Sequence, residues 1–373
     1  MQGSILKAIV IGSYFCYFVI TVVSTRASIV TPNSSSTVTV SAFTTAVDST
    51  VPTFAVTGRT KQVPNNTFVY WERLENWMQQ DKYTDTTGCA QTCALTDDQN
   101  KADFLISLNS NPPISKSRAR QYTVHFSRES LYHHGDHIHK FDLTMDMSPQ
   151  SNIPISSVPA NFWKTMHSMP IPTLAQVKKR KLAIWIASNC KSTGWNRTGW
   201  VKELTKYMQI DRPGACLNNM RARTSRAAFK GNAEIYSGYL FVFGLVNALD
   251  NRNFDEKVFQ PFSGNAVPIL RAHELVSVFA PGRHSYIDEA KYTPKALAEY
   301  LLYLQRHPRE YLEYYSYRKT ETKPPTMLEK IEQTSIYQTG HMCRICACKY
   351  DAMCMTKRNV TKAGYEETDF GSF

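Results

Sequence analysis

Cysteines and histidines are the residues of this sequence whose spacing could bind a metal or crosslink the chain. Eight cysteines fall into three groups: Cys89 and Cys93; Cys190 and Cys216; Cys343, Cys346, Cys348 and Cys354. A C-x3-C pair followed much later by C-x2-C is a spacing that can hold zinc. In an oxidising compartment the same cysteines would form disulfides instead. The choice therefore depends on the compartment.

A second cluster of possible metal ligands is the segment HHGDHIH, which contains His133, His134, His137 and His139. It resembles a zinc cluster, but three ligands must converge, and no H-E-x-x-H pattern is present. The sequence also has no Asp-x-Asp, no G-x-G-x-x-G and no G-x-x-x-x-G-K-[ST]. Dinucleotide and P-loop sites are therefore not indicated. For the histidines, a metal site, a ligand contact and a solvated loop all stay open.

The elements that must position these residues follow from apolar runs along the chain. Strands are predicted at 67–71, 102–108, 121–126, 140–147, 182–188, 234–245 and 266–270. Helices are predicted at 200–208, 255–265, 294–307 and 310–319. Alternating strands and helices indicate an α/β fold with parallel sheets and helices on both faces. A junction near 165–178 is expected to divide two lobes.

Composition limits the class of protein. The chain has 373 residues, of which 42% are hydrophobic, so it can bury a full core and is not disordered throughout. Its net charge of +12 favours an anionic ligand or surface, without indicating nucleic acid. No period of about 20–50 residues repeats, which excludes solenoids and propellers.

The N-terminal segment indicates a membrane-associated, lumenal protein. Lys7 is followed by residues 8–23 without a charge, and we predict a signal-anchor helix at 5–24 after a cytoplasmic tail at 1–4. A cleaved signal peptide is the alternative. Residues 25–62 are rich in serine and threonine and are predicted to form an extended stem.

A lumenal position favours disulfides over zinc. We predict that Cys89 and Cys93 pair with Cys343 and Cys346, and that Cys190 pairs with Cys216. Four N-x-[ST] sequons occur, at Asn33, Asn65, Asn196 and Asn359. All except Asn196 are candidates for glycosylation.

Several blocks together resemble one enzyme family. Residues 239–259, YLFVFGLVNALDNRNFDEKVF, are similar to a signature YKFYLAFENS…DYVTEKLF, with matches at Asn247, Glu256, Lys257 and Phe259. IASNCKSTGWNR contains Ser188, Asn189 and Arg197, HFSRES contains Glu129, and CRIC matches a terminal C-x-x-C. In this order and spacing the chain resembles the α1,3-fucosyltransferases of glycosyltransferase family 10.

The resemblance implies an architecture and a location. It implies a GT-B-like fold in which two Rossmann-like lobes face across a cleft, behind a membrane anchor and stem. Residues 63–175 would form the acceptor-binding lobe, 176–325 the GDP-fucose-binding lobe, and 326–373 a cysteine-rich C-terminal segment. The protein would be a single-pass type II protein of the Golgi membrane with a lumenal catalytic domain.

The resemblance also assigns roles to residues. Glu129 would be the general base, and Arg197 and Lys257 would stabilise the departing GDP in place of a metal. Further donor-binding residues would be Ser188, Asn189, Asn247, Asn253 and Glu256. His133, His134 and His137 would lie on the acceptor side. No cofactor is expected to be obligatory, with Mn2+ at most stimulating. A glycan on Asn196 would crowd the phosphate site beside it.

Some positions depart from the family pattern. Val246 and Asn253 replace a glutamate and a tyrosine, and Met147 and Asn152 replace an aromatic residue and an aspartate. Because valine cannot accept a hydrogen bond, one donor contact must be lost or supplied elsewhere.

The predicted function is transfer of L-fucose from GDP-β-L-fucose to N-acetylglucosamine in N-glycan cores or antennae. The expected partners are GDP-fucose, glycoprotein or glycolipid glycans and the Golgi membrane, and not nucleic acid. One alternative is a family member with weak or no activity that acts as a glycan-binding protein. A zinc hydrolase built on the histidine cluster is a further alternative.

Overall fold

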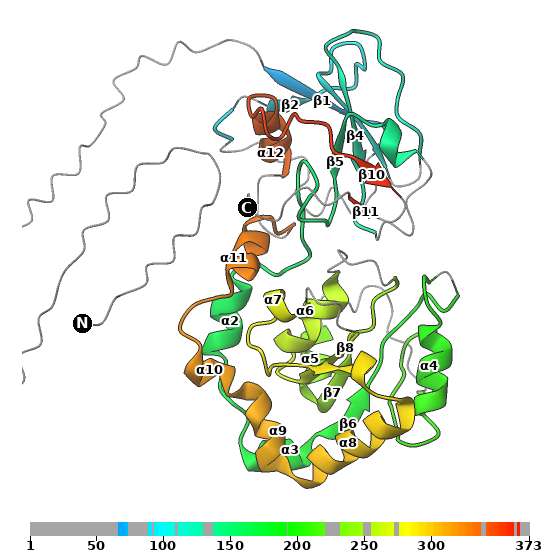
Figure 1. Cartoon of the computed structure of the whole chain (residues 1–373), viewed down its shortest axis with the longest axis vertical. Coiled ribbons are helices and arrows are strands. Elements are labelled where there is room, and N and C mark those ends of the chain that lie inside the picture. Colours follow the sequence, from blue (N-terminus) through cyan, green and yellow to red (C-terminus); the bar gives the residue numbers. More distant parts are fainter. Residues whose placement is uncertain are drawn as a thin grey trace, which may run out of the picture. The chain divides into compact units, whose positions relative to one another are not determined.

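Two parallel β-sheets organise the part of the chain that the computed structural model describes (Figure 1). The described residues are 66–73, 89–91, 93–108, 111–129, 137–191, 193–220, 232–248, 255–271, 276–336, 341–361 and 364–365. Those from 66 to 365 belong to one compact unit. The predicted α/β class with parallel sheets is confirmed.

The first sheet has the strand order β2-β1-β3-β4-β5, with every neighbouring pair parallel. Its strands are β1 (Thr67–Trp71), β2 (Cys93–Leu95), β3 (Phe104–Leu108), β4 (Tyr122–Phe126) and β5 (Leu143–Met145). Four of them were predicted from apolar runs. The sequence analysis missed β2, because a three-residue edge strand that pairs only with β1 leaves no periodic pattern.

The second sheet has the order β6-β7-β8-β9 and is also parallel. Its strands are β6 (Lys181–Ile184), β7 (Tyr239–Phe243), β8 (Val267–Leu270) and β9 (Ile287–Asp288). The predicted strand at 234–245 was wrong in its first part. Residues Asn232–Ser237 form helix α5, Gly238 follows, and only the continuous apolar run after it is a strand. The two-residue strand β9 was not predicted.

Helices cover both faces of the second sheet, as predicted. Phe241 and Phe243 pack into a core with α4 (Arg197–Leu204), α8 (Pro294–Arg306) and α9 (Pro308–Leu312). Val242, which points to the opposite face, packs with Tyr236 of α5. On that side α5 contacts α6 (Glu256–Ser263). The predicted helix at 310–319 is instead divided into α9, a 3₁₀ turn at Glu313–Tyr315 and α10 (Tyr317–Thr320).

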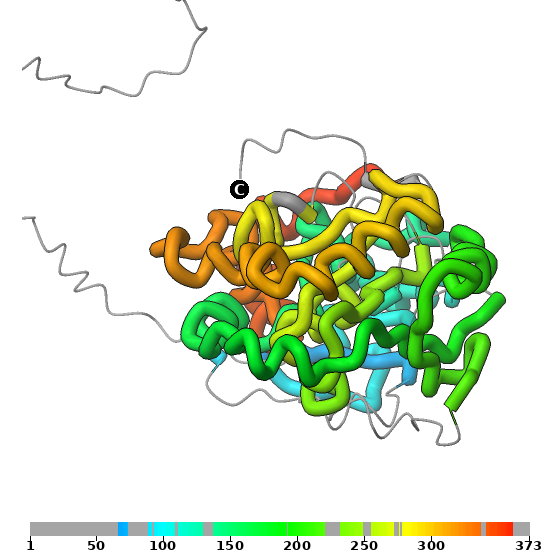
Figure 2. Tube along the Cα trace, turned by 90° about the horizontal axis from the view of Figure 1, so that it is seen from below, coloured from blue at the N-terminus to red at the C-terminus, as the bar shows by residue number. Residues whose placement is uncertain are grey.

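Five further helices of the described chain lie between or beside the two sheets. They are α2 (Phe162–Ser168), α3 (Leu174–Lys179), α7 (Val276–Phe279), α11 (Thr326–Gln333) and α12 (His341–Cys348). The segments of α2 and α3 lie beside those of α9 to α11, which are green and orange in Figure 2. Helix α12 packs on β1 and β2, so the chain returns to the first sheet near its end (Figure 1). Short elements complete the list: a 3₁₀ turn at Ile138–Lys140, another at Glu289–Lys291, and the antiparallel pair β10 (Val360–Thr361) and β11 (Gly364–Tyr365).

The predicted anchor at 5–24 and the stem at 25–62 lie outside the described residues. Within the described ranges no helix combines the length and apolar character that a membrane span requires.

Candidate active site

The carboxyl ends of β6, β7 and β8 gather most of the predicted donor-site residues. In open parallel sheets, ligands bind at this edge. The loop after β6 is joined to the loop after β7, because Gly194 N–H donates to the carbonyl of Asn247 (2.8 Å) and Trp195 Nε1–H to that of Val246 (3.0 Å). A Cβ atom on Gly244 would lie 2.2 Å from the carbonyl oxygen of Lys257. Glycine there lets the first turn of α6 approach the end of β7.

Arg197, the first residue of α4, is buried at this edge with 1% of its surface exposed. Its Nη1 donates to the carbonyl of Leu245 and its Nη2 to that of Asn189, each at 2.7 Å. Its Nε–H makes no hydrogen bond to a described residue. The guanidinium therefore joins the backbones of two loops, and its buried Nε–H is one of the donors that these two hydrogen bonds leave unused. Burial lowers the pKa of Arg197, and the negative charges of Asp255 and Glu256 offset part of this decrease.

The first turn of α6 forms a compact charge cluster. Asp255 caps the helix by accepting from the N–H of Lys257 (2.9 Å). The ammonium of Lys257 contacts Asp255 Oδ2 and Glu256 Oε1, each at 2.8 Å. Its side chain is 23% exposed. Lys257 is thus bound by two carboxylates rather than projecting alone.

The pKa values of this cluster follow from burial and mutual attraction. Burial raises the pKa of Asp255 to about 6, and the adjacent Glu256 adds to the rise against the effect of Lys257. Burial also tends to raise the pKa of Glu256, but the positive charges of Lys257 and Arg128 outweigh burial, so the pKa of Glu256 is lowered. Burial lowers the pKa of Lys257, yet the two carboxylates raise it above its usual value. Glu256 is therefore ionised and Lys257 charged at neutral pH.

Glu129 lies just beyond the carboxyl end of β4 and is exposed. Its N–H donates to Ser127 Oγ at 3.0 Å. The neighbouring Arg128 is near enough to Glu256 to affect its pKa. The end of β4 and the first turn of α6 therefore share one electrostatic environment, although β4 belongs to the first sheet and α6 packs on the second.

Three other predicted donor residues lie in the loops of the same edge. Ser188 is exposed and Asn189 half-buried after β6, and Asn189 supplies its carbonyl to Arg197. Asn247 is half-buried after β7, and its buried Oδ1 makes no hydrogen bond to a described residue. That acceptor matches a hydroxyl or amide donor on a ligand.

Some predicted residues lie outside the described ranges: Asn253, His133, His134, Asn33 and Asn65. Of the other candidates, His137 is half-buried before the 3₁₀ turn at Ile138–Lys140, and Asn359 is exposed. In the described part of the chain, no group of three or more His, Cys, Asp or Glu side chains is arranged to hold a metal ion.

Comparison with known proteins agrees with this geometry. Residues 176–361 match the family described as "Glycosyltransferase family 10 (fucosyltransferase) C-term". These residues include β6 to β9 and the cluster at α6. The chain belongs to glycosyltransferase family 10.

Relatives of this family 10 protein are named as α1,3-fucosyltransferases or as protein O-fucosyltransferases. "Alpha-(1,3)-fucosyltransferase fut-1" of Caenorhabditis elegans is 27% identical over 54% of this chain and 47% of its own length. "GDP-fucose protein O-fucosyltransferase 3" of Danio rerio is 24% identical over 59% of this chain and 52% of its own length. The chain thus spans about half the length of these relatives.

A crystal structure of an α1,3-fucosyltransferase shares the fold of this family 10 protein. The TM-score is 0.50 at 14% identity, covering 82% of this chain and 93% of that one.

In this family 10 protein, the structure shows the surroundings of two positions that depart from the family pattern, Val246 and Asn152. Val246 is buried in an apolar cluster with Val258 and Phe259 of α6, so its side chain offers no polar group to a ligand. Asn152 is buried, and its Nδ2 donates to the carbonyls of Cys354 and Thr356, both at 2.7 Å. An aspartate could not donate these bonds. Asn152 is therefore a structural residue.

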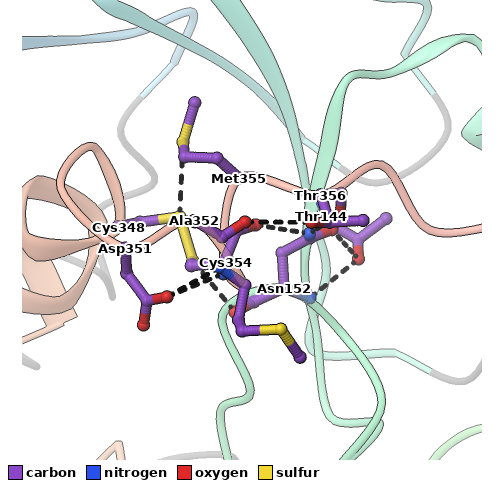
Figure 3. Close-up of a disulfide and its surroundings, with 9 residues drawn as sticks. Thr144, Asn152, Cys348, Asp351, Ala352, Cys354, Met355 and Thr356 are labelled. Atoms are coloured by element: carbon purple, nitrogen blue, oxygen red, sulfur yellow. Dashed lines mark hydrogen bonds between the residues drawn. A yellow bond between two sulfur atoms is a disulfide. The ribbon is translucent and has the colours of Figure 1, made fainter.

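Four disulfides crosslink the described chain. The long-range disulfides Cys89–Cys343 and Cys93–Cys346 join the two ends, and Cys190–Cys216 closes a local loop, so the predicted pairs are confirmed. Cys348–Cys354 is a pair that the sequence analysis did not assign. Figure 3 shows it beside Asn152, whose Oδ1 accepts from Thr144 N–H at 2.9 Å. The two long-range disulfides and this amide hold the C-terminal segment on the first sheet.

Sequence reasoning missed three residues at the carboxyl edge of the second sheet. Arg271 follows β8, and its Cζ lies 4.3 Å from the ring centroid of Trp195. Its Nη1 lies 3.2 Å from Oε1 of Glu289, which is 1% exposed. Burial raises the pKa of Glu289 to about 7, against the attraction of Arg271. The available signal was an arginine directly after β8, the third strand of this sheet.

A surface hollow of about 480 Å3 lies elsewhere. It is lined by Lys181, Ala183, Asp211 and neighbours from α8, at the beginning of β6 rather than its carboxyl end. It does not include any predicted site residue.

Proposed function

We propose that this protein transfers L-fucose from GDP-β-L-fucose to an N-acetylglucosamine residue of a glycan, with α1,3 linkage and inversion at fucose C1. The bond from C1 to the acceptor oxygen forms as the bond from C1 to the diphosphate oxygen breaks. The acceptor proton passes to a base, and GDP leaves with the electron pair. The observation that carries this proposal is the cluster of Arg197, Asp255, Glu256 and Lys257 at the carboxyl edge of a family 10 chain.

Glu129 is the proposed base. A carboxylate suits this role when it is ionised near neutral pH and can reach the acceptor hydroxyl. Two observations support this role of Glu129. Its side chain is exposed, and the neighbouring Arg128 is close enough to Glu256 to affect its pKa, so the end of β4 lies near the donor-site charges.

Lys257 and Arg197 are proposed to stabilise the leaving GDP without an obligatory metal. Lys257 keeps its charge at neutral pH, and Asp255 and Glu256 fix its ammonium in position. Arg197 holds the loops after β6 and β7, and its Nε–H is the donor proposed for a phosphate oxygen. Glu256, which is ionised and partly exposed, is proposed to accept hydrogen bonds from fucose hydroxyls. Preorganised donors of this kind stabilise charge that develops in a transition state.

The test uses the full chain with GDP-fucose and measures fucosyl transfer and GDP binding separately. Glu129→Gln should reduce turnover by at least about 100-fold while the Kd for GDP stays unchanged. Glu203→Gln is the control, because Glu203 lies on α4 and pairs with Lys206 on the surface. Wild-type turnover in Glu129→Gln would refute the assignment of the base.

The acceptor is tested with two sets of molecules, since the relatives carry names of both glycan and protein fucosyltransferases. N-acetylglucosamine-containing glycans should be fucosylated, and linkage analysis should find α1,3-fucose. Product on a protein hydroxyl alone would overturn the glycan acceptor while leaving fucosyl transfer in place.

A glycan-binding protein without transfer activity is the second candidate. The packing of Val246 favours it, because the family glutamate at that position is replaced by an apolar side chain. This candidate is supported if the wild-type protein forms no fucosylated product and binds no GDP.

We also propose a type II position in the Golgi membrane, with the catalytic part lumenal. Four disulfides support an oxidising compartment, and the uncharged run at 8–23 supports an anchor. Protease protection in intact microsomes should shield the chain after residue 62; digestion of that part would contradict the topology.

A further inference from the structure

Arg271 differs from Arg197 and Lys257, the two predicted phosphate-binding cations at the carboxyl edge of the second sheet. Arg197 is buried and donates to two backbone carbonyls, and Lys257 is bound by two carboxylates. The Arg271 side chain is 29% exposed. No hydrogen bond links its guanidinium to another residue in the described ranges, where its polar contacts are those with Trp195 and Glu289.

Two contacts hold the Arg271 guanidinium in place. It lies over the ring of Trp195, which is itself anchored to the carbonyl of Val246. Glu289 lies 3.2 Å away, but its buried Oε1 makes no hydrogen bond to a described residue. The pair is therefore an ion pair of poor hydrogen-bond geometry. An arginine stacked on an aromatic ring keeps its in-plane N–H donors available for a planar or bidentate acceptor.

The charges at this edge leave a role for a third cation. When all groups are ionised, Arg197 and Lys257 are balanced by Asp255 and Glu256, so these four residues present no net positive charge. Arg271 has Glu289 as its counter-charge, but the burial of Glu289 favours the neutral carboxyl. Of Arg197, Lys257 and Arg271, Arg271 is thus the least compensated cation at this edge, where an anionic ligand would bind.

We propose that Arg271 binds a phosphate group of the nucleoside diphosphate at the carboxyl edge of the second sheet. This inference rests on the proposed function and adds to it a donor-binding residue outside the family pattern. Guanidinium groups bind phosphate oxygens through two parallel N–H donors, which a single ammonium cannot match.

The test compares binding of GDP and of guanosine by calorimetry, using the full chain. Arg271→Met should weaken GDP binding by about 10- to 100-fold, because a charge-assisted hydrogen bond is lost. Guanosine, which has no phosphate, should bind as it does to the wild type. Arg309→Met is the matched control, since Arg309 is an exposed arginine on α9, and it should leave both ligands unaffected.

Arg271→Lys keeps the charge and decides the question if Arg271→Met does not fold. It should weaken GDP binding several-fold, with guanosine binding unchanged. Wild-type GDP binding in the folded variants, or an equal loss for GDP and guanosine, would overturn the role of Arg271 and leave the proposed function standing. A wild-type protein that neither binds GDP nor transfers fucose would instead overturn both.

Discussion

The buried guanidinium of Arg197 should be a major determinant of stability in the second sheet. Its two hydrogen bonds join carbonyls that lie 56 residues apart, from Asn189 to Leu245. Each hydrogen bond from a charged donor contributes about 1.5–3 kcal/mol. Arg197→Met retains much of the apolar volume but leaves both carbonyls without this donor. We expect the free energy of unfolding to fall by about 3–6 kcal/mol.

Urea unfolding followed by tryptophan fluorescence measures this change. Arg197→Lys should lower the free energy of unfolding by roughly half as much as Arg197→Met. Its ammonium retains the charge but cannot reach both carbonyls as the guanidinium does. Lys202→Met is the control, since Lys202 is exposed on the same helix, and should change stability by less than about 0.5 kcal/mol. If Arg197→Met unfolds within about 1 kcal/mol of the wild type, the bridging role is wrong.

Three further predictions concern other parts of the fold. Asn152→Asp should lower the free energy of unfolding by about 1–3 kcal/mol, because two partly buried carbonyls lose their donor; a thermal melt checks it, and an unchanged midpoint would contradict the role of the amide. The folded-state pKa of Glu289 is raised, so its contribution to stability is full below its unfolded pKa near 4.5 and is lost as the pH rises through about 7. Between pH 5 and 8 the wild type should therefore lose about 2 kcal/mol more stability than Glu289→Gln, and parallel pH profiles would rule this out. Replacing the cysteines of one long-range disulfide with serine should lower the free energy of unfolding by less than half of the loss caused by replacing both pairs. The remaining disulfide still closes the same long loop, so additive losses in denaturant unfolding would refute this.

Local pattern predicted much of the fold. The mostly apolar runs at 102–108, 121–126 and 266–270 became β3, β4 and β8, because buried parallel strands have few polar residues. The same rule failed at 234–237, where Ile235 and Tyr236 are apolar but belong to α5. A short apolar run does not distinguish a buried helix from a strand.

The sequence by itself predicted the α/β class from periodicity and the family from the order of motifs. It also predicted three of the four disulfides, because the N-terminal segment indicates an oxidising lumen. Only the tertiary structure decided what the charged residues contact. Arg197 meets the carbonyl of Leu245, and Arg271 stacks on Trp195. Parallel crossovers bring the ends of β6, β7 and β8 to one edge, so side chains far apart in sequence become neighbours. Their hydrogen bonds depend on that convergence, and periodicity, which is a local property of the chain, carries no information about it.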